Sequence, residues 1–232
     1  MFYLLTRKKR ARVHFLHIGK TGGSAIKYAL KGNTKNSKYV IKLHNHETYM
    51  NMIPDGEKII FFLRDPISRF VSGFYSRKRK GRPRYYVEWS KEEREVFSTF
   101  ETPRELASAL ADEMSSLHKT AIIAMRSIEH FSPYKKWYVD ISYFKSRMDD
   151  IFFIGFQETL RQDFSLLLNM LNIPERNARL PDDNVLAHKN PSTVDKCIDE
   201  DGRRALLSWY AEDYKFLHIC RSIMEERGVQ RY

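Results

Sequence analysis

Residues 13–30 read VHFLHIGKTGGSAIKYAL. The stretch starts as a short apolar, β-branched run, continues through a glycine-containing turn and has a helical pattern from residue 25 onward. This order predicts an anion cradle, because glycines let the backbone wrap an oxyanion and the N–H groups at a helix start point toward it. Lys20 adds a positive charge, and Thr21 and Ser24 add hydroxyl donors. A plain structural turn is the alternative that the residues leave open.

A second junction of the same kind lies in residues 58–77, which read KIIFFLRDPISRFVSGFYSR. The apolar run predicts a parallel strand covered on both faces, and Asp65 followed by proline predicts the start of a helix. Arg64 stands at the carboxyl end of that strand, where ligands bind in parallel sheets. With Ser72 it offers a guanidinium and a hydroxyl, which suit a phosphate monoester. Alternatively, Arg64 pairs with a structural carboxylate and Ser72 packs against another helix.

The rest of the chain alternates between apolar runs and helical patterns, which favours an α/β fold with a central parallel sheet flanked by helices. Ligands should then bind at the loops after residues 18, 43, 63 and 155. We expect further strands at 38–43 and 150–155, helices at 103–125 (interrupted near 115–116), 160–171 and 195–226, a mobile loop at 77–94 and a long loop at 174–194.

The composition predicts one folded domain over residues 1–232, because 42% of the 232 residues are hydrophobic. A net charge of +11 favours anionic partners. The two cysteines, Cys197 and Cys220, match no metal spacing and give no disulfide framework. No apolar run reaches the ~18 residues of a membrane helix, and the N-terminus lacks the order of a signal peptide. We therefore expect a cytoplasmic protein without a transmembrane segment or a metal site.

Together, the two motifs resemble those of the sulfotransferases that use 3′-phosphoadenosine 5′-phosphosulfate (PAPS). The likeness is greatest to the carbohydrate branch, which includes the heparan sulfate 2-O-sulfotransferases. It implies a P-loop-NTPase-like sulfotransferase fold. It also implies that the first loop binds the 5′-phosphosulfate, through Lys20, Thr21, Gly22, Gly23 and Ser24, and that Arg64 and Ser72 bind the 3′-phosphate. Residues 152–158 are similar to the family's later strand. Residues 188–192, which include Lys189, resemble the late loop that closes over the nucleotide. The chain departs from the family at Gly19, where proline is usual, and at Ala25.

The resemblance implies transfer of a sulfuryl group from PAPS to a hydroxyl of a carbohydrate-type acceptor, possibly anionic, with Lys20 stabilising the departing nucleotide and no metal. A base must take the hydroxyl proton. His44 and His46 lie two residues apart, so in an extended segment both point to the same side, and neutral imidazole accepts a proton at physiological pH. The family has a similar His-x-His pair, and we favour His46, with His44 second. Glu47 could orient or replace them, and two surface histidines are the alternative.

Two other functions stay open. A nucleotide-dependent kinase would share the architecture, although Lys20 precedes both glycines, unlike the lysine of a Walker A motif. A non-catalytic basic module would bind polyanions with steep salt dependence, but a nucleic-acid partner is not expected. The basic run 77–84 either grips an anionic acceptor or is a solvated loop. His17 is assigned to packing beside the loop, and His14, His118, His130 and His218 receive no role.

Overall fold

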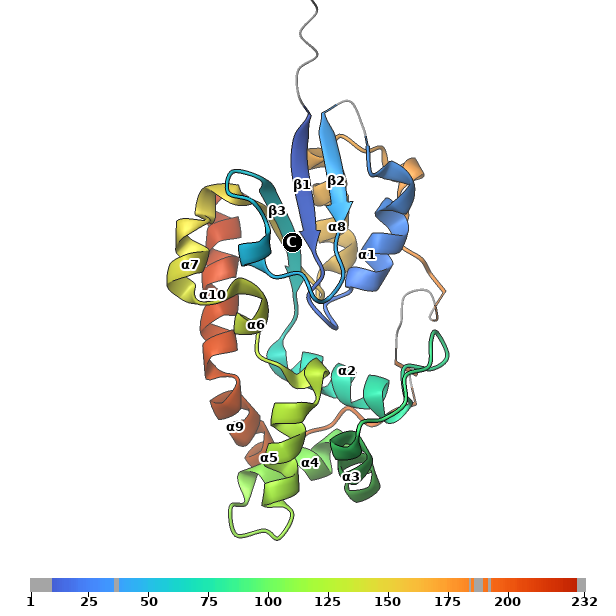
Figure 1. Ribbon diagram of the computed structural model, residues 1–232, viewed down its shortest axis with the longest axis vertical. Coiled ribbons are helices and arrows are strands. Elements are labelled where there is room, and N and C mark those ends of the chain that lie inside the picture. The colour runs from blue at the N-terminus through green and yellow to red at the C-terminus, as the bar shows by residue number, and fades with distance from the viewer. Residues whose placement is uncertain (1–9, 36–37, 184, 186–189, 192, 229–232) are drawn as a thin grey trace, which may run out of the picture.

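A four-stranded parallel sheet forms the centre of the molecule (Figure 1). The computed structural model describes residues 10–35, 38–183, 185, 190–191 and 193–228. The strands are β1 (Ala11–Leu16), β2 (Tyr39–Leu43), β3 (Lys58–Leu63) and β4 (Ile151–Phe156), in the order β2-β1-β3-β4 with every neighbouring pair parallel. The predicted α/β class and all four predicted strands are confirmed.

Helices cover both faces of the sheet because successive side chains of a strand point to opposite faces. The ring of Phe61 contacts Phe144 and Phe216 on one face, and Phe62 contacts Phe15 and Phe153 elsewhere in the core. Figure 1 shows the red and yellow helices across the sheet from the blue and tan ones. The first group is α6 (Lys135–Tyr138), α7 (Ile141–Ser146) and α10 (Ala211–Glu226), and the second is α1 (Gly23–Leu30) and α8 (Leu160–Met170).

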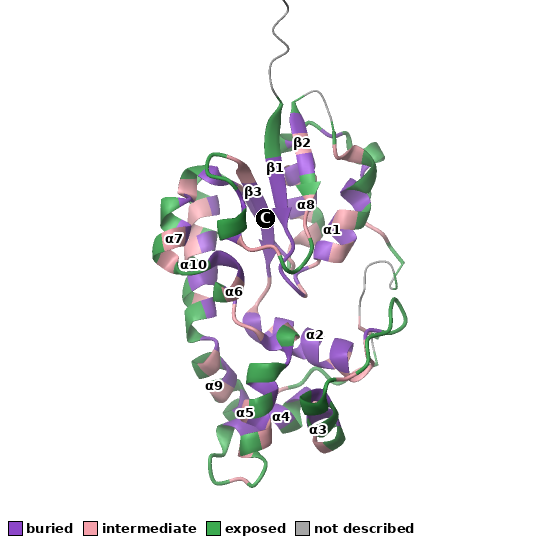
Figure 2. Ribbon diagram, in the orientation of Figure 1, coloured by how far each residue is buried: buried purple, intermediate pink, exposed green. Residues whose placement is uncertain are grey.

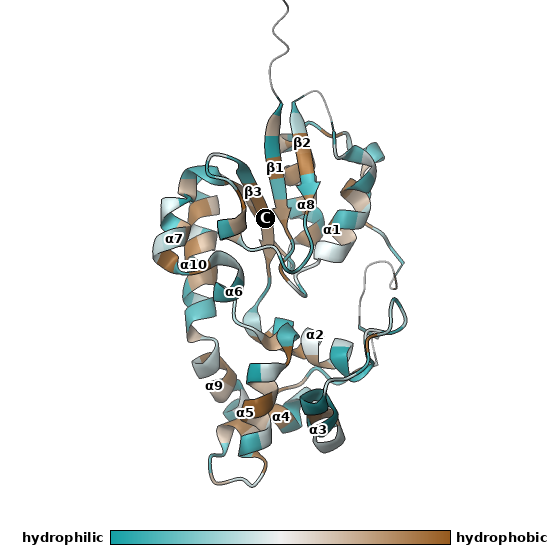
Figure 3. Ribbon diagram, in the orientation of Figure 1, coloured by the Kyte–Doolittle hydropathy of each residue, from teal (hydrophilic) through white to brown (hydrophobic). Residues whose placement is uncertain are grey.

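A second hydrophobic cluster lies beyond the carboxyl ends of the strands. It contains large buried side chains such as Phe70, Phe74 and Phe131. Figure 2 shows α2 buried along most of its length, and Figure 3 shows apolar residues on α2 and α5. Its helices are α2 (Pro66–Lys78), α3 (Lys91–Thr99), α4 (Pro103–Ala111), α5 (His118–Ser127) and α9 (Glu200–Trp209). Single 3-10 turns are η1 (Lys31–Asn33), η2 (Met50–Met52), η3 (Glu129–Phe131), η4 (Met148–Asp150) and η5 (Glu175–Asn177).

Helix α2 begins as the sequence predicts. Asp65 is the N-cap, and its Oδ1 accepts a hydrogen bond of 2.8 Å from the backbone N–H of Ser68. The other carboxylate oxygen accepts from the Tyr214 hydroxyl at 2.8 Å, which ties the cap to α10. The direction of α2, and with it the placement of Ser72, is therefore fixed at its first residue.

The predicted loop at 77–94 is wrong at its second end, because α3 begins at Lys91, whereas α2 ends at Lys78, within one residue of the predicted start of the loop. Ser90 and Glu93 form a capping box, the usual start signal of a helix. The break in the helical pattern near 115–116 is confirmed, and the C-terminal helical region begins at Glu200, with Asp199 as its N-cap. The extent of a single domain stays a prediction. Among the described residues, no helix combines the length and apolar character needed to cross a membrane.

Candidate active site

A cavity of about 880 Å³ lies at the carboxyl edge of the sheet, where the strand–loop–helix pattern predicts a ligand site. Its walls come from the loops after all four strands, from α2 and from the segment before α9. The residues predicted for the site that line it are Lys20, Gly22, Gly23, Ser24, His46, Arg64 and Ser72. The two sequence motifs therefore share one crevice.

The glycine loop has the backbone geometry of an anion cradle. Gly22 is the N-cap of α1 at φ 89°, a conformation that favours glycine. At Gly23 a Cβ atom would come within 2.1 Å of the Cδ2 of buried His17, so only glycine lets the helix start this close to β1. The first amides of α1 have no partner inside the helix and lie at its positive end. Thr21 is not among the lining residues, because it is buried and its hydroxyl donates to the Ile18 carbonyl at 2.9 Å.

Lys20 and Arg64 line this cavity together, and Arg64 contacts the backbone of Lys20. The Arg64 guanidinium donates through Nε to Ser68 Oγ at 2.9 Å and through Nη1 to the Lys20 carbonyl at 3.4 Å. Desolvation, together with the positive charges of Arg79 and Arg64, lowers the pKa of Lys20 to about 7. Desolvation also lowers the pKa of Arg64, while negative Glu158 opposes that shift. Such a cluster of desolvated cations is stabilised when an anion enters it.

Ser72 lines the same cavity two turns into α2. Asn190 of the late loop lies beside it: the Asn190 side-chain amide is 3.5 Å from the Ser72 carbonyl and its Oδ1 accepts from Arg79 at 2.7 Å. Lys189, the site residue predicted in this loop, lies outside the described residues. The late loop thus reaches the Ser72 side of the cavity at Asn190.

His46 faces the cavity with a defined tautomer. Its Nδ1 lies 3.2 Å from the carbonyl oxygen of His17, and a carbonyl only accepts, so Nδ1 carries the proton and Nε2 keeps its lone pair. The ring also packs on the His17 ring at a centroid distance of 3.8 Å. Desolvation by the surrounding protein lowers the pKa of His46, and positive Lys27 and Lys20 contribute in the same direction. The ring is therefore neutral at pH 7 and has one nitrogen available to accept a proton.

His44 does not line the cavity, contrary to the expectation that both rings point to the same side. Its Nε2 lies 2.7 Å from Nδ1 of His14, whose Nε2 is 2.5 Å from a Glu57 carboxylate oxygen. The physical reason is a turn at Asn45, whose Oδ1 accepts from the backbone N–H of Glu47 at 3.2 Å. The segment is not extended, so the two-residue period does not apply to it.

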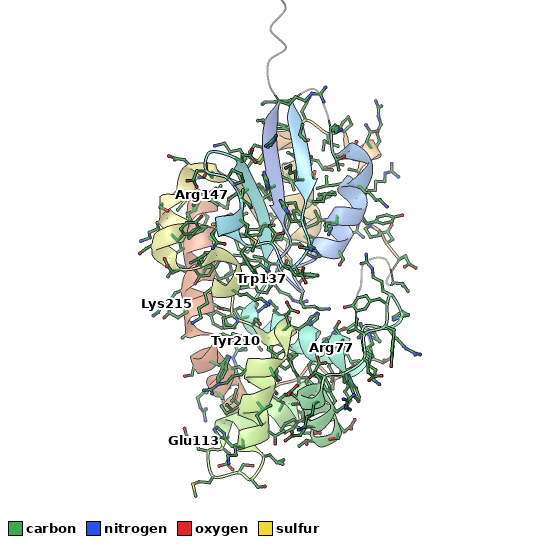
Figure 4. All side chains as sticks on the ribbon, viewed as in Figure 1. Arg77, Glu113, Trp137, Arg147, Tyr210 and Lys215 are labelled. Atoms are coloured by element: carbon green, nitrogen blue, oxygen red, sulfur yellow. The ribbon has the colours of Figure 1, made fainter. Side chains whose placement is uncertain are left out.

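A buried arginine that the sequence analysis passed over holds the site together. Arg69 is fully buried, donates to the Gly19 carbonyl at 3.0 Å and to the Ser132 carbonyl at 2.7 Å, and stacks on the rings of Tyr134 and Trp137. Figure 4 marks Trp137 between the sheet and α2. The signal was present in the spacing of Arg64 and Arg69, since both follow the same strand.

His130 is a second lining residue without a predicted role. Desolvation lowers its pKa well below the ordinary value, and positive Lys20 is the next largest cause. It reaches the cavity from η3, more than sixty residues after α2 begins, and no local motif marks it. Only the packing of two distant segments brings it to the site.

Three cations of the basic run 77–84 form ion pairs within the chain, and a grip on an anionic acceptor stays a prediction. Arg77, which is labelled in Figure 4, is buried in α2. Its Nε and Nη2 each donate a hydrogen bond of 2.6 Å to one of the two carboxylate oxygens of Glu93. Lys78 pairs with Glu101 at 2.8 Å and Lys80 with Glu88 at 2.6 Å. Much of the run therefore has a structural role.

The part of the chain that the structure describes contains no group of three or more His, Cys, Asp or Glu side chains that could hold a metal ion. The expectation that the reaction needs no metal stays a prediction.

Comparison with known proteins agrees with this geometry. The family model described as the sulfotransferase family matches residues 4–218, which is most of the chain. No curated protein and no solved structure matched the chain significantly. The family match spans the glycine loop, the Arg64 junction and the strand β4 that together build the cavity. The chain is therefore a member of the sulfotransferase family.

Proposed function

We propose that this sulfotransferase takes its sulfuryl group from PAPS and transfers it to a hydroxyl of a carbohydrate-type acceptor. One observation carries the proposal. The glycine loop and the Arg64–Ser72 pair line one cavity, with Arg64 Nη1 3.4 Å from the Lys20 carbonyl. A nucleotide with phosphates at both its 5′ and 3′ positions needs two anion sites in one crevice. The carbohydrate class of the acceptor rests on the resemblance to the carbohydrate branch of the family.

The residues present fit such a donor. A volume of about 880 Å³ lies within the ~300–1,000 Å³ of small-molecule and cofactor sites. Gly22 and Gly23 form a cradle that a Cβ atom would crowd, with Leu160 at 3.2 Å from the first and His17 at 2.1 Å from the second. Lys20 and the amides at the start of α1 would hold the 5′ end, and Arg64 with Ser72 the 3′-phosphate. When bound, PAPS supplies an activated sulfuryl group.

His46 is the proposed base. Its Nδ1–H is held by the His17 carbonyl, so Nε2 accepts the proton of the acceptor hydroxyl as that oxygen bonds to sulfur. The backbone of His46 is fixed as well, because Trp137 donates its indole N–H to the His46 carbonyl at 3.1 Å. Lys20 neutralises the charge that develops on the departing phosphate.

Transfer of labelled sulfate from PAPS to a panel of glycans tests the proposal. We expect His46→Ala to lower kcat by about 10²–10⁴-fold, as the loss of a general base does, and Lys20→Ala to weaken binding of the product nucleotide PAP. His44→Ala is the matched control, because this ring lies outside the cavity and should affect kcat much less. Absence of both PAP binding and sulfate transfer in the unmodified protein would refute the proposal.

A further inference from the structure

His130 lies in the η3 turn, and its side chain lines the cavity. The turn is held rigidly on three sides. Phe131 is fully buried in the helical cluster, its carbonyl accepts from the Tyr210 hydroxyl at 2.9 Å, and the next carbonyl, that of Ser132, accepts from Arg69 at 2.7 Å. The backbone that carries His130 is therefore fixed on both sides of Phe131.

Helix α2 makes room for this histidine at one position. A Cβ atom at Gly73 would come within 2.9 Å of the His130 Cβ and 3.2 Å of its carbonyl oxygen. Glycine there lets η3 pack directly on α2 beside Ser72. The close approach brings His130 to the cavity wall rather than to the outer surface of the helical cluster.

The faces of α2 separate two roles within the cavity. Ser68 and Ser72 lie four residues apart and form one stripe, and Arg69 and Gly73 form the next. The first stripe lies with Arg64, where the 3′-phosphate is proposed to bind. The second faces Gly19 and the η3 turn, because Arg69 donates to the Gly19 and Ser132 carbonyls. His130, which packs against Gly73, therefore lies on the side of α2 that faces Gly19 and the loop proposed to hold the 5′ end with its sulfuryl group.

From this geometry we infer that His130 is a second catalytic imidazole, which donates a hydrogen bond to a non-bridging oxygen of the sulfuryl group during transfer. The inference rests on the proposed function. Desolvation keeps the pKa of His130 well below its ordinary value, so the ring is neutral. A neutral imidazole has one N–H donor and one acceptor nitrogen.

In the balanced step, the hydroxyl proton passes to His46 Nε2 and the acceptor oxygen bonds to sulfur. The bond between sulfur and the 5′-phosphate oxygen breaks, and its electron pair stays on that oxygen beside Lys20. His130 keeps its proton throughout and only stabilises charge on the sulfuryl oxygens. Loss of one such donor typically costs about 10²–10³-fold in kcat.

The kinetic test compares His130→Ala and His130→Gln with His218→Ala, a histidine on the exposed side of α10. We expect His130→Ala to lower kcat by about 10²-fold with unchanged PAP affinity and an unchanged acid limb of the pH profile. His130→Gln, which keeps an N–H donor, should recover part of that loss, and His218→Ala should match the unmodified protein. An unaltered kcat in His130→Ala, a parallel loss of PAP binding, or loss of the acid limb would overturn the inference.

A second measurement does not need turnover. Carbethoxylation of His130 is measured by mass spectrometry in samples that contain nucleotide but no acceptor. We expect PAPS to slow this modification more than PAP does, because only PAPS carries the sulfuryl group. Equal protection by PAPS and PAP would overturn the role of His130 while leaving the proposed function intact. A protein that binds neither nucleotide would instead overturn the proposed function.

Discussion

At the scale of single residues, the site is a collection of groups held away from their ordinary protonation behaviour. Lys20 shares its surroundings with Arg64 and Arg79, and the pKa of Lys20 falls to about 7. His46 and His130 are both kept neutral, chiefly by desolvation. Perturbed groups of this kind cluster at functional sites. A bound anion should reverse the shift of Lys20 and leave the histidines neutral.

If a bound anion raises the pKa of Lys20 again, the protein must take up a proton when it binds PAP. Above a pH of about 7 free Lys20 is largely neutral, and a bound phosphate raises its pKa toward the ordinary range. Binding then takes up close to one proton at pH 8 and almost none below pH 6, so affinity should fall as the pH rises through this interval. Calorimetry in buffers with different ionisation enthalpies measures the uptake. A binding enthalpy at pH 8 that does not depend on the buffer would contradict it, and Lys20→Met is the control that should abolish the dependence.

Most of the individual site residues could be predicted from the sequence, but not all of them. Lys20, Gly22, Gly23, Ser24, Arg64, Ser72 and His46 could be found because each follows a strand directly or sits in the helix after it. His44 could not be placed, because the Asn45 turn overrides the extended period. His130 depends on packing between distant segments, which no local pattern encodes, whereas Arg69 follows the same strand as Arg64 and only its contact with Gly19 depends on the fold.

At the scale of elements, the junction between β1 and α1 positions the anion cradle. The helix begins directly against His17, and the approach is so close that Gly23 leaves no room for a side chain. The strands were predictable because continuous apolar runs are typical of parallel sheets. The start of α3 was not, because its capping box lies at the end of a basic stretch with turn residues. The short helices α6 and α7 are too short to show a periodic pattern.

Substituting two glycines tests this junction. Gly23→Ala places a methyl group 2.1 Å from a ring atom of buried His17, so α1 must shift. We expect a loss of about 1–3 kcal/mol in the free energy of unfolding, as overpacking causes, and weaker PAP binding. The matched control is Gly32→Ala, where no atom lies within 4 Å of the added methyl group. Urea titration and calorimetry measure both effects, and equal behaviour of the two variants would show that the close approach does not position the cradle.

At the scale of the whole molecule, the cavity lies between two hydrophobic clusters, one around the sheet and one among α2, α3, α4, α5 and α9. Polar contacts connect α2 to the sheet cluster. Arg69 of α2 donates to the Gly19 carbonyl after β1 at 3.0 Å, and the Tyr214 hydroxyl of α10 donates to Asp65, the N-cap of α2, at 2.8 Å. A ligand that touches both the glycine loop and α2 adds a further connection. Its binding should therefore stabilise both clusters together.

A nucleotide bound between the two clusters should stabilise the whole protein. At 100 times its Kd, PAP should stabilise the folded protein by about 2.7 kcal/mol, which for a chain of this size corresponds to a rise in Tm of roughly 5–10 °C. Amides of α1 and of α2 should both exchange more slowly in hydrogen-exchange measurements, because the two phosphates contact elements in different clusters. At the same concentration ATP should stabilise less, since it has no 3′-phosphate for Arg64 and Ser72. In Arg64→Met the advantage of PAP over adenosine 5′-phosphate should disappear. If ATP stabilises the protein more than PAP does, the cavity serves a kinase-like donor instead, because protection would then depend on the 5′ phosphates alone.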